Sequence, residues 1–252
     1  MGMNVLKELS KNGNTFTVDD ALKVSGSTKE VIWVILSRME EKGWIERIEK
    51  GKYMIIPLDS KKGEYTLHEF VIGSLLVEPY CIAYWSALHF YGFTEQIPRT
   101  VFIQTTSRKK NRMPEIFGID YQVVQIKESR FFGIRREWID ETSVNITDRE
   151  KTIVDCLDKP RYCGGVVEVA KALKTREFDK KELVKYAERI ENTGVIRRLG
   201  YLCDLLEIDI VLPDLDTKNF LYLDPGMPKE GERSSKWGLV INLDDKVLGE
   251  LE

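Results

Sequence analysis

The sequence predicts an α+β protein, in which a small N-terminal unit of helices and a hairpin precedes a larger domain of mixed strands and helices. Apolar residues recur at helical spacing through residues 5–39, and two short β-rich runs then flank a glycine. Over residues 57–66 the composition shifts to proline, serine, lysine and glycine, which indicates a domain edge. Beyond this edge, β-rich runs and helical patterns alternate.

The first two helices are predicted from their end signals. Apolar spacing marks a short amphipathic helix that ends at Asn12-Gly13, a helix-stop signal. Thr17 is a good N-cap for the second helix, and Asp20 stands three residues later. This helix is expected to end at Ser25-Gly26.

The third helix and a hairpin complete the N-terminal unit. Ser27 is the expected N-cap and Glu30 the expected partner in a capping box. The helix ends at Lys42-Gly43, where glycine fits the left-handed C-terminal position. Residues 44–48 and 52–56 are β-rich and flank a glycine turn, so a hairpin is expected. The expected buried stripe of the third helix is Ile32, Ile35, Leu36 and Met39.

Three helices and a hairpin within residues 1–58 are the pattern of a winged helix-turn-helix, whose third helix enters the major groove of DNA. The outward face of that helix and the cations of the hairpin are then expected to contact DNA. A threonine at the first turn can also bind a phosphate together with the helix N-terminus. The expected DNA-binding residues are Thr28, Lys29, Glu30, Trp33, Ser37, Arg47, Lys50 and Lys52.

Other interpretations of this unit stay open. Its 9 Lys and Arg against 8 Asp and Glu give a charge of +1, which is weak for a DNA binder and favours help from an oligomer or another basic segment. Trp33 can instead pack beneath the hairpin, and the capping box can occupy Glu30. The whole unit can also be a protein-interaction module that never meets DNA.

The C-terminal domain, residues 66–252, is expected to combine a small, mostly antiparallel sheet with a helical part. Apolar helices are expected at 68–77 and 83–91, and a capping box at Thr147–Glu150 opens another helix. Further helices are expected at about 164–174, 179–191 and 194–207. The expected strands lie at 101–106, 121–126, 131–134, 143–146, 221–223 and 239–241.

Charge is unevenly distributed in this domain. Residues 108–136 contain 8 Lys and Arg against 3 Asp and Glu, whereas residues 201–252 contain 5 against 12, so an acidic tail is expected from about residue 204. Gathered on one face, the basic side chains would form a second patch for DNA or RNA; scattered, they are a solvated loop. They are Arg108, Lys109, Lys110, Arg112, Arg130, Arg135 and Arg136.

The reactive side chains argue against an enzyme. His68 and His89 are the two histidines, and the four cysteines lack metal-ligand spacing, so buried thiols, no metal and no cofactor are expected. No glycine-rich phosphate loop occurs, and Gly73-Ser74 lacks the paired carboxylates of a nucleotidyltransferase. A faint acid…acid-x-Lys set, with Asp216 behind Asp204 or Asp209, leaves a metal-dependent nuclease open as an alternative.

No targeting signal or membrane segment is expected. The chain has a formal net charge of −3 and 42% apolar residues, and no window approaches 18 uninterrupted apolar residues, so no membrane span is expected. The first residues fit neither a signal peptide nor a transit peptide, and a cytoplasmic location is expected.

Two stretches of the second domain resemble motifs of the AbiEi-type antitoxins, which are also described as transcriptional regulators of viral defence systems. Residues 82–98 carry the Ser-Ala-Leu, Tyr-Gly and Thr-Glu-Gln-x-Pro elements of one motif. Residues 148–160 are similar to a second motif through Lys151–Cys156. The N-terminal unit also fits the family's architecture, so the resemblance covers most of the chain except about the last 45 residues.

The resemblance implies a non-enzymatic antitoxin of a type IV toxin–antitoxin system with a role in phage defence. Its winged helix would bind inverted repeats in its own promoter, as a dimer on the double-stranded DNA, and repress its own operon. Its C-terminal domain would counter a nucleotidyltransferase toxin without a stable complex between the two proteins. The family has no catalytic motif, so no active-site residue carries over.

Overall fold

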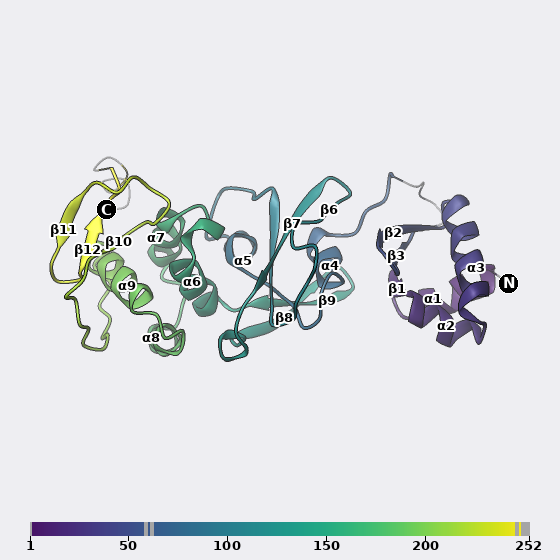
Figure 1. Ribbon diagram of the computed structural model, residues 1–252, viewed down its shortest axis with the longest axis horizontal. Helices are drawn as coiled ribbons and strands as arrows, with labels where there is room; N and C mark the ends of the chain where they lie inside the picture. Colours follow the sequence, from purple (N-terminus) through teal and green to yellow (C-terminus); the bar gives the residue numbers. More distant parts are fainter. Residues whose placement is uncertain (1, 58–59, 61–62, 245–246, 248–252) are drawn as a thin grey trace.

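The structure is a computed structural model that describes residues 2–57, 60, 63–244 and 247. The molecule is elongated, and three parts follow one another along its long axis in sequence order (Figure 1). The N-terminal helices lie at one end, a six-stranded sheet with its helices lies in the middle, and further helices with a small sheet lie at the other end. The fold is thus mixed, with helices and small sheets, as the sequence predicts.

Within residues 2–57, the N-terminal part consists of three helices and a three-stranded antiparallel sheet with β3 at its centre. The predicted apolar stripe of the third helix is confirmed, because Ile32, Ile35, Leu36 and Met39 are all buried. The elements are α1 (Gly2–Ser10), β1 (Thr15–Thr17), α2 (Val18–Ser25), α3 (Lys29–Glu41), β2 (Ile45–Glu49) and β3 (Lys52–Ile55).

Capping decides where these helices begin. Thr17 and Asp20 form a capping box at the start of α2: Thr17 Oγ1 accepts from the Asp20 amide at 3.2 Å, and Asp20 Oδ2 accepts from the Thr17 amide at 2.9 Å. The capping box expected at Ser27 is wrong, because α3 begins one residue later with Thr28 as its N-cap. The Ser27 amide donates to Ser25 Oγ at 3.2 Å and so belongs to the preceding turn.

The middle part is built on one sheet with the strand order β6-β7-β5-β4-β9-β8. The β5–β7 and β4–β9 pairs are parallel, and the other neighbouring pairs are antiparallel. The elements are α4 (Glu69–Ser74), β4 (Cys81–Ile82), α5 (Tyr84–Phe90), β5 (Thr100–Thr105), β6 (Glu115–Ile116), β7 (Ile119–Gln125), β8 (Ile134–Ile139) and β9 (Thr142–Thr147).

The strand expected at residues 131–134 is wrong in its position. Residues 128–130 form a 3-10 turn, and β8 begins at Ile134. Gly133 separates the two with φ 63°, and a Cβ there would lie 2.8 Å from the Cβ of Lys151. The chain therefore turns sharply against α6 at a point where the sequence suggests a continuous strand.

Helices and a small sheet form the third part. The helices expected at 164–174, 179–191 and 194–207 are confirmed, with ends that shift by about two residues. The N-cap of α6 is Asp148, whose Oδ1 accepts from the Lys151 amide at 2.8 Å, so the capping box expected at Thr147 is wrong. The elements are α6 (Arg149–Asp158), α7 (Val166–Thr175), α8 (Lys180–Arg189), α9 (Thr193–Leu205), β10 (Leu221–Tyr222), β11 (Glu232–Ser234) and β12 (Leu239–Ile241).

The acidic C-terminal segment packs against these helices in its described part. Arg197 and Arg198 of α9 are buried, and they donate to the carbonyls of Asn219 at 2.7 Å and Leu223 at 2.9 Å, respectively. Asp224 Oδ2 accepts from the amide of Val166, the first residue of α7, at 2.8 Å. Buried arginines and a carboxylate at a helix N-terminus thus attach the segment.

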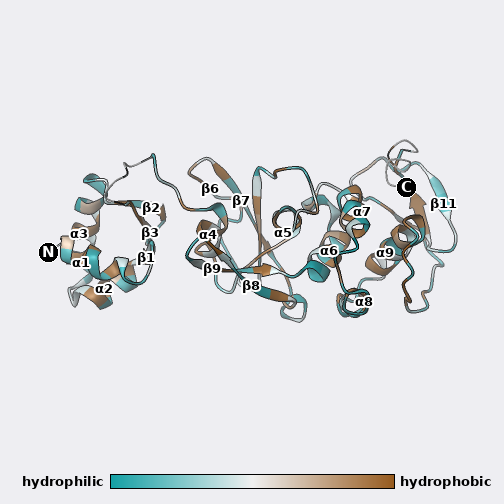
Figure 2. Cartoon of the chain, turned by 180° about the vertical axis from the view of Figure 1, so that it is seen from behind, coloured by the Kyte–Doolittle hydropathy of each residue, from teal (hydrophilic) through white to brown (hydrophobic). Residues whose placement is uncertain are grey.

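Hydrophobic residues occur along the strands of the middle sheet (Figure 2), and the buried ones belong to two cores. One core joins the sheet to helices α5 to α9, and the other joins it to α4. Ile48 and Met54 of the N-terminal hairpin belong to the second core, so the hairpin packs on the middle part. The four cysteines are free and buried, as expected. In the described part of the chain, no helix combines the length and apolar character that crossing a membrane requires.

Candidate nucleic-acid interface

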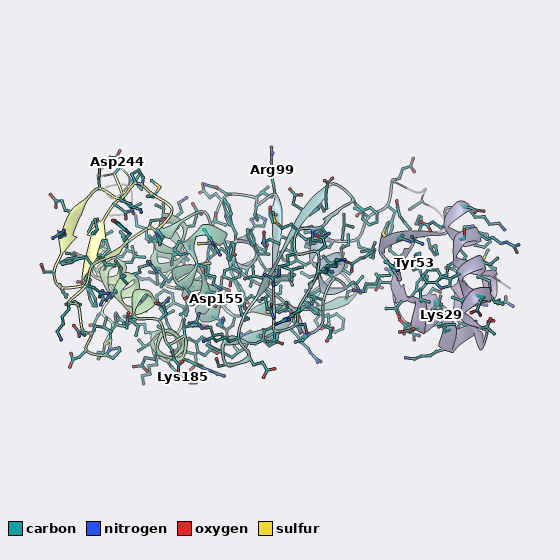
Figure 3. The ribbon with its side chains drawn as sticks, viewed as in Figure 1. Lys29, Tyr53, Arg99, Asp155, Lys185 and Asp244 are labelled. Atoms are coloured by element: carbon teal, nitrogen blue, oxygen red, sulfur yellow. The ribbon has the colours of Figure 1, made fainter. Side chains whose placement is uncertain are left out.

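Helix α3 lies at the outer end of the molecule, and Lys29 marks its first turn (Figure 3). Its buried stripe packs on α1, α2 and the N-terminal sheet, which leaves the opposite side free. Basic, acidic and apolar residues are mixed on that side, so the exposed surface of α3 carries little net charge. Its exposed residues are Lys29, Glu30, Val31, Val34, Ser37, Arg38 and Glu41.

The structure places most of the predicted α3 residues at the surface. Thr28, Lys29, Glu30 and Ser37 are exposed, whereas Trp33 is half-buried against the N-terminal core. Hydrogen bonds from its own amide and from Thr28 lower the pKa of Glu30, so this carboxylate stays negative at neutral pH. A phosphate at the first turn of α3 would therefore meet an anion next to Lys29.

The hairpin cations differ in their availability. Arg47 donates to the hydroxyl of Tyr53 at 3.0 Å, and Lys52 lies 3.3 Å from Glu49 Oε2 and 3.4 Å from the carbonyl of Leu76. Lys50 is exposed in the turn and makes no ion pair within the part of the chain that the structure describes. Lys50 is thus freer than Arg47 and Lys52 to contact a phosphate.

The basic loop after β5 lies beside this hairpin. Lys109 Nζ lies 2.6 Å from Glu49 Oε1 and donates to the carbonyl of Leu76, also at 2.6 Å. Together with Glu49 and Asn111, the residues Arg108, Lys109 and Lys110 line a shallow cleft of about 590 Å³ between hairpin and loop. The loop residues Arg108, Lys110 and Arg112 are exposed. The 108–112 portion of the second basic patch therefore adjoins the hairpin, and Lys109 joins the two.

The remaining predicted basic residues lie elsewhere. Arg130 lies 3.1 Å from Asp158 and donates to the carbonyl of Ile190 at 2.7 Å, so it links the turn before β8 to the helices. Arg135 and Arg136 are exposed on β8, the edge strand at the opposite side of the sheet from β6 and β7. The predicted patch is thus divided, and its 108–112 portion alone adjoins the hairpin within the described residues.

The structure contains a buried polar cluster that the sequence analysis does not predict. Lys151 and Asp155 form an ion pair inside the protein, and Gln104 Nε2 donates to Asp155 Oδ2 at 2.7 Å. Lys151 Nζ also lies 4.9 Å from the ring centroid of Phe132. The i,i+4 spacing of opposite charges is a signal for the pair, but nothing in the sequence indicates its burial. The cluster joins α6 to the middle sheet.

The residues considered for catalysis are dispersed. Within residues 2–57, 60, 63–244 and 247, no group of three or more His, Cys, Asp and Glu side chains could hold a metal ion. Asp204 pairs with Lys236 at 2.6 Å, and Asp216 pairs with Lys218 at 3.4 Å. His68 Nδ1 accepts from the Phe70 amide at 3.1 Å and caps α4.

The N-terminal part matches a known protein family. Residues 4–56 match the family model of the AbiEi antitoxin transcriptional regulators. The predicted AbiEi resemblance is confirmed for this segment. The model describes transcriptional regulators, so the match supports a general antitoxin or regulatory role. The motif stretches 82–98 and 148–160 lie outside the matched residues and within the packing of α5 and α6.

The whole chain is similar in fold to a solved structure. The crystal structure of the RV2827C protein from Mycobacterium tuberculosis aligns with a TM-score of 0.70 over 99% of this chain and 94% of the other. The two sequences are 15% identical, so this likeness concerns the fold alone. Among curated proteins, no match to the sequence was found.

Proposed function

We propose that residues 1–58 form a winged helix-turn-helix that binds double-stranded DNA, and that the chain is a DNA-binding transcriptional regulator. The match of residues 4–56 to the AbiEi regulator model carries this proposal. The order of helices and hairpin in the same residues supports it, because a third helix followed by a hairpin is the arrangement that reads a major groove.

Phosphate contacts come from two places in this proposal. Lys29 lies at the N-terminus of α3, and Lys50 lies in the turn of the hairpin. Arg108, Lys110 and Arg112 extend the basic surface from the hairpin onto the middle part. Such contacts position the protein on a duplex without reading its sequence, and they compensate for the nearly neutral surface of α3.

In its cellular role, the chain would be the antitoxin of a type IV toxin–antitoxin system with a function in phage defence. It would repress its own operon by placing one copy on each half of an inverted repeat, and so act as a dimer on DNA. Its cognate toxin would be a nucleotidyltransferase, countered without a stable complex. The resemblance to AbiEi-type antitoxins supports these finer assignments.

A gel-shift titration against the protein's own upstream DNA tests base reading. The double substitution Lys29→Ala, Ser37→Ala should weaken specific binding by about 1–3 kcal/mol for each base that the variant no longer reads. Both residues are exposed, so stability should be retained. Lys185→Ala, at an exposed lysine of α8, is the matched control. Wild-type affinity in the double variant would remove these two residues from the reading set.

The salt dependence of binding tests the basic loop. Replacing Arg108, Lys110 and Arg112 with Ala should lower affinity and flatten the slope of log affinity against log salt by roughly 0.9 for each phosphate that is no longer neutralised. Since these side chains carry no base information, affinity for operator and random duplexes should fall alike. An unchanged slope would contradict a role for the loop on DNA.

A protein-interaction module is the second candidate, and one observation favours it. The exposed surface of α3 carries Val31 and Val34 between its charged residues, which is unusual for a surface that faces phosphates. Failure to shift any upstream fragment, in a chain that is folded, would favour this alternative.

A further inference from the structure

An apolar groove runs along α3 on the side that faces the start of α1. It has a volume of about 660 Å³, and Gly2, Met3, Val31, Val34 and Trp44 contribute to its lining. Met3, Val31 and Val34 are 47%, 42% and 50% exposed, so the groove has an open apolar floor. These exposed apolar side chains on α1 and α3 offer a small apolar surface for contact with another protein.

The charges beside the groove have a self-complementary order. Glu30, Val34 and Arg38 follow one another at four-residue spacing and therefore form one ridge of α3. Glu30 and Arg38 each lie about 6 Å along the helix from Val34, in opposite directions. Arg38 makes no ion pair with any residue that the structure describes, and it lines the groove together with Glu30.

We propose that this face of α3 binds α3 of a second copy of the chain. A twofold axis near Val34 would place the two helices antiparallel, with Val34 against its counterpart and Val31 inside the groove. The same axis sets Glu30 opposite Arg38 of the second copy, and Arg38 opposite Glu30, so both ion pairs form at once. A ridge with an acid at one end and a base at the other suits an identical antiparallel partner.

The position of α3 leaves room for this partner. The helix lies at the outer end of the elongated molecule, and the middle and C-terminal parts extend away from it (Figure 1). Two copies can therefore meet end to end at α3 without contact between their larger parts.

The contact has a consequence for DNA, which rests on the proposed function. Glu30 belongs both to the ridge and to the set of residues predicted to face DNA, and Ser37 lies beside the ridge. A second copy on α3 would therefore cover the surface that reads the duplex. The α3-linked dimer is the DNA-free state, and binding of each copy to a half-site requires the dimer to open.

Charge reversal tests the dimer directly. Sedimentation equilibrium of the full chain without DNA should show a monomer–dimer equilibrium, and Glu30→Arg or Arg38→Glu should each weaken it by about tenfold, because like charges then face each other across both contacts. The double variant Glu30→Arg, Arg38→Glu restores complementary pairs and should restore dimerisation. A monomeric wild type, or a double variant no better than the single ones, overturns the proposal.

Further variants show whether a loss of dimer comes from the α3 contact or from misfolding. Val34→Gln changes the centre of the ridge at an exposed position and should also favour the monomer. Lys23→Glu, on the exposed surface of α2 and outside the groove, should leave the equilibrium unchanged. Melting temperatures equal to that of the wild type establish that each variant is folded. Loss of dimer with Lys23→Glu as well would overturn the assignment to α3.

Addition of operator duplex separates this proposal from the proposed function. If duplex binds and the protein–protein dimer dissociates as it does so, competition for α3 is supported. If the α3-linked dimer persists on the duplex, the competition is overturned. If no duplex binds while charge reversal still controls dimerisation, the DNA-binding proposal fails and the α3 contact stands.

Discussion

At the scale of single residues, Gly200 shows how close packing can reverse a helix preference. Gly200 lies inside α9, and a Cβ there would overlap the indole of Trp237. Alanine normally stabilises a helix interior over glycine by about 1 kcal/mol, whereas overpacking costs about 1–3 kcal/mol. We therefore expect Gly200→Ala to lower the free energy of unfolding by about 1 kcal/mol in urea denaturation.

The neighbouring side chain provides the control for this prediction. In a Trp237→Leu background the smaller side chain leaves room for the new methyl group, and Gly200→Ala should then be neutral or stabilising. An equal loss of stability in both backgrounds would show that Trp237 is not the cause.

The cysteines give a second prediction at this scale. All four are buried, and burial raises the pKa of Cys203 to about 12 and holds the pKa of Cys81 and Cys156 well above the ordinary range. The thiolate is the reactive form, so the native protein should react slowly with Ellman's reagent at pH 8. All four thiols should react rapidly in denaturant. A thiol that reacts in the native protein as fast as free cysteine would contradict its burial.

At the scale of elements, two N-cap threonines differ in whether their side chains make a capping hydrogen bond. Thr17 accepts from the Asp20 amide and completes a capping box, whereas Thr28 makes no side-chain cap bond to α3. Thr17→Ala should therefore lower the free energy of unfolding by about 1 kcal/mol. Thr28→Ala should cost less than about 0.5 kcal/mol, which makes it a clean variant for DNA binding. Equal losses in urea denaturation would contradict this difference.

Local signals account for what could be predicted about the elements. Helix α2, for example, follows from the Thr17 cap and from Gly26 at its C-terminus. At Ser27 and Thr147 the capping pattern points one residue too early, because the next residue, Thr28 or Asp148, takes the N-cap position. A four-letter pattern does not show which of two adjacent polar residues has the extended backbone of a cap.

Local sequence signals could not predict which distant strands pair with each other. The parallel β5–β7 and β4–β9 pairs join segments whose β-rich composition says nothing about their neighbours. The contacts of the basic residues could not be predicted either. Lys109 pairs with Glu49, which is 60 residues away in the chain, and Arg130 pairs with Asp158. Sequence therefore indicates which residues are charged, but tertiary contacts decide which of them remain free for a ligand.

At the scale of the whole molecule, one ion pair helps to attach the N-terminal part to the middle part. The side chain of Lys109 is 10% exposed, and its ammonium contacts Glu49 and the carbonyl of Leu76, beside Ile48 and Met54 in the shared core. An ion pair enclosed in this way resists screening by salt. The orientation of α3 relative to the rest of the chain therefore depends partly on this contact.

Lys109→Met tests that dependence, because it keeps the aliphatic stem and removes the ammonium. The substitution leaves Glu49 with Lys52 as its ion-pair partner. We expect it to lower the free energy of unfolding by about 1–3 kcal/mol and to let the N-terminal part open more often. Hydrogen exchange should quicken in β2 and β3 and stay unchanged in α6, since local opening exposes the amides that the contact protects. Lys110→Met, at an exposed neighbour, should have no such effect. Equal exchange in the two variants would mean that apolar packing of the hairpin, rather than the ion pair, fixes the position of α3.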